Sequence, residues 1–156
     1  MFCLDIPGKP SLELEHVVFD FNGTLATGGV LDETVKQLIE KVKAFLEVHI
    51  ITSDTYGSAR NQCHELKVHV ETLSGDNCGE SKATFVKQLG ATKTICIGNG
   101  QNDVQMFQTA ACSMVIIGSE GCSVKALMSA DIAVTNIEDA LNMLLNPRTI
   151  VATLRT

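Results

Sequence analysis

Short apolar runs, many of them rich in β-branched residues, recur along the chain with helix-like segments between them. Most of the runs are continuous rather than alternating with polar residues, which is typical of parallel strands covered on both faces. The predicted strands are Val17–Phe21, Val48–Thr52, Val68–Leu73, Thr94–Ile97, Met114–Ile117 and Ile132–Val134.

The segments between these runs carry apolar residues at helical spacing. After Asp32, a typical N-cap residue, an apolar stripe continues to Val42. Further helices are predicted at Ser58–Leu66, Ser81–Leu89, Asn102–Ala110, Ser123–Ala130 and Ile137–Leu145. Because strand and helix alternate to the end, we predict an α/β fold: a three-layer α/β/α sandwich around a mainly parallel, Rossmann-like sheet.

Composition limits the size and setting of this fold. The 156 residues, 45% of them hydrophobic, are enough for one domain over residues 1–156. Within it, residues 1–15 are predicted to form a short N-terminal preface strand, because Leu12 and Leu14 alternate with acidic residues. The net charge of −6 argues against nucleic-acid or anionic membrane partners. No apolar run approaches the roughly 20 residues of a membrane helix. The N-terminus has no signal-peptide pattern, so we expect a cytoplasmic protein.

The six cysteines do not suggest a metal site. They form no C-x-x-C pair and no tight cluster with the four histidines. This pattern favours buried, reduced thiols over zinc ligation.

Polar groups follow four of the predicted strands. Asp20 ends the first run and Thr52 the second, while Lys82 and Asp103 come after the third and fourth. In open α/β sheets, ligands bind at the carboxyl ends of the strands, so these groups are expected on one rim. An aspartate can attack phosphorus, a hydroxyl and a lysine can neutralise phosphate oxygens, and Mg²⁺ can bridge carboxylate to phosphate. Singly, each residue has a plain structural explanation; their order favours phosphoryl transfer.

Four short motifs carry a resemblance to a known family. "DFNGT", "IITSD", "ESK" and "GNGQND" resemble the motifs of the haloacid dehalogenase (HAD) superfamily, and most closely those of soluble relatives of the P-type ATPase phosphorylation domain. The first corresponds to D-x-D-G-T in phosphatases, and the last to G-D-G-x-N-D. The similarity runs from about Leu12 to Val134 and implies a Mg²⁺-dependent phosphatase that forms an aspartyl phosphate.

The resemblance assigns roles residue by residue. It implies Asp20 as the nucleophile. The expected catalytic residues are Asp20, Asn22, Thr52 and Lys82. The expected phosphate-binding residues are Gly23, Thr24, Thr52, Ser53, Lys82 and Asn102. The expected Mg²⁺ ligands are Asp20, Asn22 through its backbone carbonyl, Asn99 and Asp103.

Two asparagines depart from the family pattern. Asn22 stands where phosphatases have a second aspartate, the acid that protonates the leaving group. An amide cannot exchange a proton usefully at pH 7, and general acid–base catalysis is typically worth about 10²–10⁴-fold, so we expect slow turnover. Asn99 replaces the first acid of the fourth motif, so metal binding should be weaker.

The short spacing between motifs leaves no room for a cap domain. An open mouth suits a small phosphorylated metabolite or a larger phosphorylated substrate, or a homo-oligomer in which a neighbouring subunit serves as the lid. Capless, tetrameric sugar-acid phosphatases of the same superfamily are an alternative within the enzyme hypothesis. The alternative from another class is a catalytically degenerate scaffold that binds phosphate or a protein partner.

Overall fold

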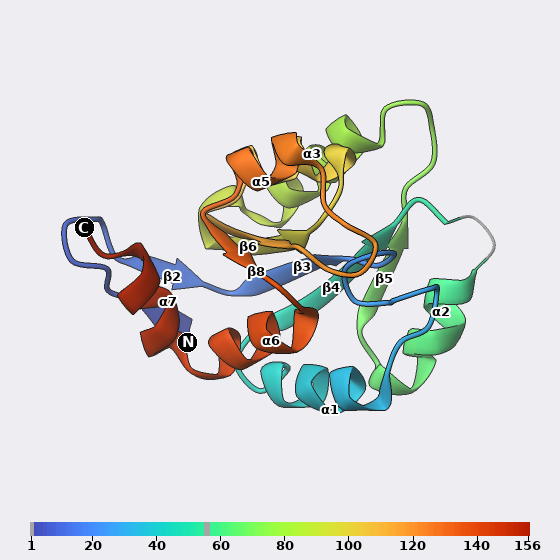
Figure 1. The fold of residues 1–156 in the computed structure, drawn as a ribbon, viewed down its shortest axis with the longest axis horizontal. Coiled ribbons are helices and arrows are strands. Elements are labelled where there is room, and N and C mark those ends of the chain that lie inside the picture. The colour runs from blue at the N-terminus through green and yellow to red at the C-terminus, as the bar shows by residue number, and fades with distance from the viewer. Residues whose placement is uncertain (1, 55–56) are drawn as a thin grey trace.

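A six-stranded parallel sheet forms the centre of the protein (Figure 1). The computed structural model describes residues 2–54 and 57–156. The strand order is β5-β4-β3-β6-β7-β8. The strands are β3 (His16–Asp20), β4 (Glu47–Thr52), β5 (His69–Thr72), β6 (Thr94–Gly98), β7 (Cys112–Ile116) and β8 (Ile132–Val134). The predicted α/β sandwich with a mainly parallel sheet is confirmed.

Helices cover both faces of this sheet (Figure 1). On one face lie α1 (Glu33–Val42), α2 (Ser58–Cys63) and α6 (Ile137–Leu145), and on the other α3 (Cys78–Leu89), α4 (Val104–Thr109) and α5 (Val124–Ser129). Successive residues of a strand point to opposite faces, so Val17 and Phe19 join the first core and Val18 joins the second. This double coverage explains why the runs are continuously apolar.

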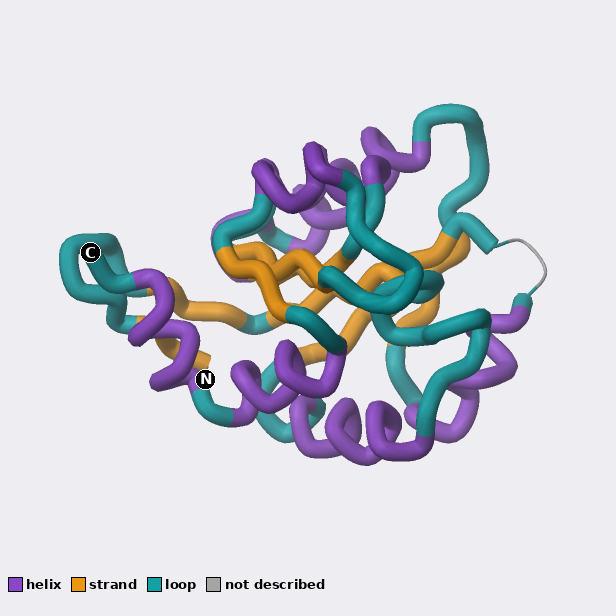
Figure 2. The backbone as a smooth tube through the Cα atoms, in the orientation of Figure 1, coloured by secondary structure: helices purple, strands orange, loops and turns teal. Residues whose placement is uncertain are grey.

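The N-terminal segment forms a hairpin beside the last helix. β1 (Phe2–Leu4) and β2 (Leu12–Leu14) pair antiparallel, where the sequence predicted one preface strand. α7 (Pro147–Leu154), which the sequence analysis did not predict, contacts β1. Its start signal was present, since proline favours the first turn of a helix. Figure 2 shows both elements beside the main sandwich.

Three helices differ from their predicted bounds. α3 begins at Cys78 rather than Ser81 because Asn77 caps it: its side chain accepts a hydrogen bond from the Glu80 N–H at 3.2 Å. The predicted helix Asn102–Ala110 is divided into a 3₁₀ turn, η3 (Gln101–Asp103), followed by α4. The predicted helix Ser58–Leu66 is likewise divided into α2 and a 3₁₀ turn, η1 (His64–Leu66). A further 3₁₀ turn, η2 (Ala91–Lys93), precedes β6.

A short flap follows β3. Thr27 and Val30 exchange backbone hydrogen bonds of 3.1 Å across Gly28 and Gly29. Both glycines have positive φ, at 60° and 76°, as a two-residue type I′ hairpin requires. Between β3 and β4 the chain forms only this flap, α1 and connecting turns.

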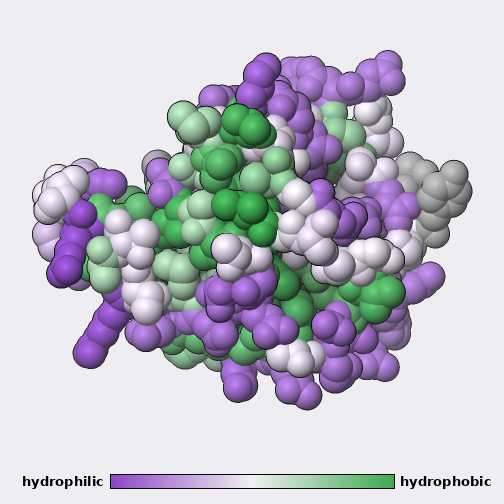
Figure 3. Space-filling view, viewed as in Figure 1, coloured by the Kyte–Doolittle hydropathy of each residue, from purple (hydrophilic) through white to green (hydrophobic). Residues whose placement is uncertain are grey.

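The surface carries an apolar area over α5. Figure 3 shows hydrophobic side chains gathered on this face, where Val124 and Met128 are 73% and 80% exposed. Among the described residues, no helix combines the length and the apolar character needed to cross a membrane.

Candidate active site

A polar cleft of about 680 Å³ opens at the carboxyl end of the sheet. Its wall combines the ends of β3, β4 and β6 with the start of α3, as the switch point of an open α/β sheet predicts. The lining residues are Asp20, Asn22, Thr52, Ser53, Asp76, Asn77, Cys78, Gly79, Asn99, Gly100, Gln101, Asn102 and Gln105.

Lys82 joins the two aspartates beneath this cleft. Its Nζ donates to Asp20 Oδ1 at 2.9 Å, to Asp103 Oδ1 at 2.8 Å and to Asn102 Oδ1 at 3.1 Å. The lysine is only 1% exposed although it lies on a helix, because its side chain reaches from α3 to the end of β3. Buried charges are held in proteins when they are paired in this way.

Asp103 is fixed by the backbone of the preceding loop. Its Oδ2 accepts hydrogen bonds of 2.9 Å from the N–H groups of Asn99 and Gly100. Gly98 makes this possible, since a Cβ at that position would lie 2.4 Å from Asp103 Oδ2. The glycine therefore leaves room for a carboxylate that is 0% exposed.

The site has less positive than negative charge. Burial raises the pKa of Asp20 to about 6; Asp103 adds to the rise, and Lys82 offsets only part of it. Burial lowers the pKa of Lys82, but the two carboxylates outweigh this effect and leave it above its ordinary value. One ammonium thus faces two carboxylates, and an additional cation would be stabilised beside them.

Thr24 links the first and fourth motifs. Its hydroxyl lies 3.2 Å from both Asp20 Oδ2 and Asn99 Oδ1, so it can donate to either oxygen. Gly23, with φ +77°, packs so closely that a Cβ would lie 2.5 Å from Asn99 Nδ2. Gly23 and Thr24 border a neighbouring hollow rather than the Asp20 cleft, so the structure does not bring these two expected phosphate ligands into the cleft wall.

The remaining expected site residues lie around the cleft. Thr52 is buried at the end of β4, and its hydroxyl accepts a hydrogen bond from the Asp54 N–H at 3.0 Å. Asn22 and Ser53 are exposed at the mouth. The start of α3 also forms part of the cleft wall, which the predicted helix start at Ser81 did not indicate, although the Asn77-x-x-Glu80 capping pattern marks it.

The neighbouring hollow, of about 320 Å³, lies behind the flap. The charged residues that line it, Asp32, Glu120 and Glu138, are all acidic. The Asp20 cleft differs from this hollow because the Lys82 ammonium lies beside its aspartates.

The chain shares sequence with two archaeal proteins. It is 44% identical over 63 residues to an uncharacterised protein of Methanocaldococcus jannaschii, covering 40% of this chain and 68% of that one. It is 27% identical over 123 residues to the soluble P-type ATPase-like phosphatase of the same organism, covering 77% of this chain but 45% of that protein. No protein-family model matches the chain.

Solved structures share its fold. A protein of Streptomyces avermitilis described as a HAD family hydrolase superposes with a TM-score of 0.69 at 16% identity, covering 92% of this chain and 87% of the other. The 3-deoxy-D-manno-octulosonate 8-phosphate phosphatase of Moraxella catarrhalis, in complex with magnesium, phosphate and KDO, superposes with a TM-score of 0.70 at 16% identity, covering 91% and 94%.

These solved structures identify the fold. The architecture is that of the HAD-like α/β hydrolases. The chain's sequence relatives include a protein described as a soluble P-type ATPase-like phosphatase, and the chain spans about 45% of that protein's length.

Proposed function

We propose that the chain is a phosphohydrolase in which Asp20 attacks the phosphorus of a phosphate monoester. The observation that carries this proposal is the buried Lys82, which bonds Asp20 and Asp103 at the edge of one polar cleft. With a pKa of about 6, Asp20 is mostly ionised at pH 7 and has the electron pair that an attack requires.

The residues present fit a divalent cation. The side chains of Asp20, Asp103 and Asn99 and the backbone carbonyl of Asn22 offer the hard oxygen donors that Mg²⁺ prefers. The Lys82 ammonium lies against two buried carboxylates, those of Asp20 and Asp103, so a further cation would balance the remaining negative charge. When bound, Mg²⁺ would supply positive charge against the phosphate oxygens.

The chain's own groups then account for the transfer. A carboxylate oxygen of Asp20 forms a bond to phosphorus while the ester O–P bond breaks. The electron pair of the broken O–P bond leaves with the ester oxygen. The Thr52 hydroxyl can donate a hydrogen bond to a phosphoryl oxygen, and the Lys82 ammonium, whose protons go to Asp20, Asp103 and Asn102, adds positive charge beside it. The N-terminus of α3, at the cleft wall, adds backbone N–H groups that favour an anion. Water attack on the aspartyl phosphate releases inorganic phosphate and restores Asp20.

Asn22 determines which substrates turn over well. It lies exposed at the mouth, where the leaving oxygen would depart, and it has no proton to give. Aryl and acyl phosphates, whose leaving groups need no proton, should therefore react faster than alkyl phosphates. An uncapped cleft also admits a phosphorylated sugar acid, the substrate class named for the Moraxella catarrhalis neighbour.

The test is Asn22→Asp, assayed with aryl and alkyl phosphates with and without Mg²⁺. We expect turnover of alkyl phosphates to rise by up to about 10²-fold, the lower end of what proton transfer contributes. Asn99→Asp is the comparison variant: it should lower the Mg²⁺ concentration required and change turnover at saturating metal much less.

The same assay decides between enzyme and scaffold. Release of phosphate that requires Mg²⁺ supports the enzyme. If neither aspartate variant nor the double variant hydrolyses any phosphomonoester of a broad panel, the proposal is wrong and the degenerate scaffold replaces it.

A further inference from the structure

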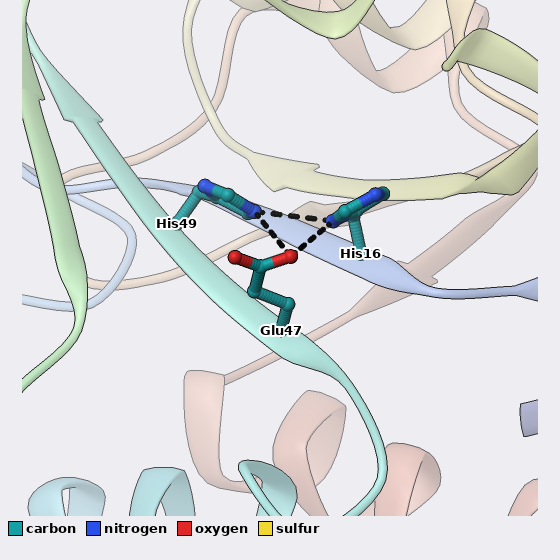
Figure 4. Close-up of side chains that lie close together, drawn as sticks. All are labelled: His16, Glu47 and His49. Atoms are coloured by element: carbon teal, nitrogen blue, oxygen red, sulfur yellow. Dashed lines mark hydrogen bonds and ion pairs between the residues drawn. The ribbon is translucent and has the colours of Figure 1, made fainter. Parts of the chain in front are cut away.

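A second polar cluster lies at the opposite end of the sheet, where β3, β4 and β5 begin. His16 opens β3, Glu47 opens β4, and the strand register places them side by side. His49 follows Glu47 by two residues and therefore shares its face of the sheet. Figure 4 shows the two imidazoles and the carboxylate turned toward one another.

The facing atoms are spaced like the ligands of a metal ion. His16 Nδ1 lies 3.2 Å from His49 Nε2 and 3.1 Å from Glu47 Oε2. His49 Nε2 lies 3.9 Å from the same carboxylate oxygen. Tetrahedral zinc with bonds of about 2.0–2.1 Å separates its ligand atoms by about 3.4 Å, which falls within this range.

We propose that His16 Nδ1, His49 Nε2 and Glu47 Oε2 form a binding site for Zn²⁺. Imidazole nitrogens with a carboxylate oxygen form a donor set typical of zinc. Mg²⁺, which selects oxygen ligands, would not compete well for two ring nitrogens. The site is independent of the proposed phosphatase chemistry.

Neighbouring side chains hold these ligands in place. His69 Nε2 lies 2.8 Å from Glu47 Oε1, which leaves Oε2 directed at the other two rings. The His69 ring also stacks on His49 with centroids 4.9 Å apart. On the far side of His16, Glu15 Oε2 lies 3.9 Å from Nε2. Carboxylates and hydrogen bonds behind the ligands are a regular feature of metal sites.

Burial and access also suit an ion site. The His49 side chain is 6% exposed and the edge of Phe85 packs against its ring, so its position is fixed. The Glu47 side chain is 49% exposed, which leaves one side open for an ion to enter and for water to complete the coordination. The described residues thus form a site anchored in the sheet and open to solvent.

The site is separate from the Asp20 cleft. His16 and Asp20 occupy the two ends of β3, about 13 Å apart at 3.3 Å per residue. A zinc titration in excess Mg²⁺ therefore reports on the histidine site, because Mg²⁺ would compete for the proposed all-oxygen site but not for two ring nitrogens.

The experiment titrates metal-free full chain with Zn²⁺ in excess Mg²⁺ by calorimetry, with native mass spectrometry for stoichiometry. We expect one Zn²⁺ per chain, and in Co²⁺-loaded protein the visible absorption of a low-symmetry site. His16→Gln and Glu47→Gln should each weaken zinc binding by about 10–100-fold or more. His64→Gln, which alters the histidine outside the cluster, should bind zinc like wild type.

Three outcomes would overturn the proposal: no zinc bound in excess Mg²⁺, zinc retained by His16→Gln and Glu47→Gln, or equal loss in His64→Gln. Glu47→Gln is nearly isosteric and half-exposed, so a folding failure is not expected; circular dichroism verifies this. Histidine NMR signals of wild type give a readout without mutation. Zinc must shift the rings of His16 and His49 and leave His64 unchanged.

Discussion

The two ends of β3 carry polar clusters of opposite construction under the same helix. At the carboxyl end α3 supplies Lys82, whose ammonium lies between two buried carboxylates. At the amino end α3 supplies Phe85, whose ring edge packs against the neutral ring of His49. One cluster therefore holds its own cation, whereas the other offers nitrogen lone pairs and one carboxylate. One helix and one strand thus support two clusters with different donor atoms, and the metal preferences that we propose for them differ for this reason.

The largest effect is expected from Asp20→Asn. Removing a covalent nucleophile costs phosphatase turnover about 10⁴-fold or more, while zinc binding at the other end of β3 should stay at one equivalent. Beryllofluoride with Mg²⁺ should raise the melting temperature of wild type but not of the variant, and His64→Gln should keep wild-type turnover. Retained turnover in Asp20→Asn would remove the nucleophile assignment. Lost zinc would show that the two ends are coupled.

Lys82→Met should produce the next largest effect, on stability. Two buried carboxylates lose their cation, so urea unfolding of the metal-free variant should show a loss of about 3–5 kcal/mol. Mg²⁺ should restore part of this loss, because it binds only the folded carboxylate pair. Lys93→Met is the matched control: Lys93 pairs with Glu15 at 2.7 Å on the surface, and little change is expected. Equal losses in both variants would contradict the neutralising role of Lys82.

The smallest effect concerns pH, because the two ends of β3 respond to acid in opposite senses. Burial lowers the pKa of His49 from 6.5 to about 4, with Glu47 opposing the shift and His69 and His16 adding to it. Because the folded chain favours the neutral ring, the contribution of His49 to the free energy of unfolding is complete above pH 6.5 and is lost as the pH falls through 4. Burial raises the pKa of Asp20 from 3.8 to about 6, so the folded chain favours its protonated form. The contribution of Asp20 to the free energy of unfolding is therefore complete below pH 3.8 and is lost as the pH rises through 6.

Unfolding of metal-free protein between pH 6.5 and 4 separates the two contributions. Asp20→Asn should lose stability more steeply than wild type as pH falls, and His49→Gln less steeply, each by about 1–3 kcal/mol across the window. Identical pH slopes in wild type and both variants would show that neither group titrates as described.

The fold could be predicted from the sequence because buried parallel strands have a recognisable apolar pattern. Continuous apolar runs mark strands covered on both faces, and their ends place Asp20, Thr52 and Asp103 on one rim. Lys82 could be placed at this rim because it follows the third strand. The exact contacts of Lys82 and the start of α3 at Cys78 could not, since they depend on side-chain packing and on one capping asparagine.

The histidine cluster could not be found from the sequence. Glu47 and His49 are close in the chain, but His16 comes from another strand, and only the register of β3 against β4 brings it beside them. Parallel register follows from the packing of the whole sheet and has no local motif. The spacing of cysteines and histidines along the chain therefore does not reveal this cluster.

The loops of the active-site edge also affect how the protein ages chemically. Asn22 and Asn99 both precede glycine, the sequence in which the next backbone nitrogen most readily attacks the side-chain amide to form a succinimide. In the folded chain both attacking nitrogens are engaged: Gly23 N donates to the Ala26 carbonyl and Gly100 N to Asp103, each at 2.9 Å. Folding therefore protects these amides from deamidation. The amount of aspartate or isoaspartate at either position should increase with the time that the protein has spent unfolded.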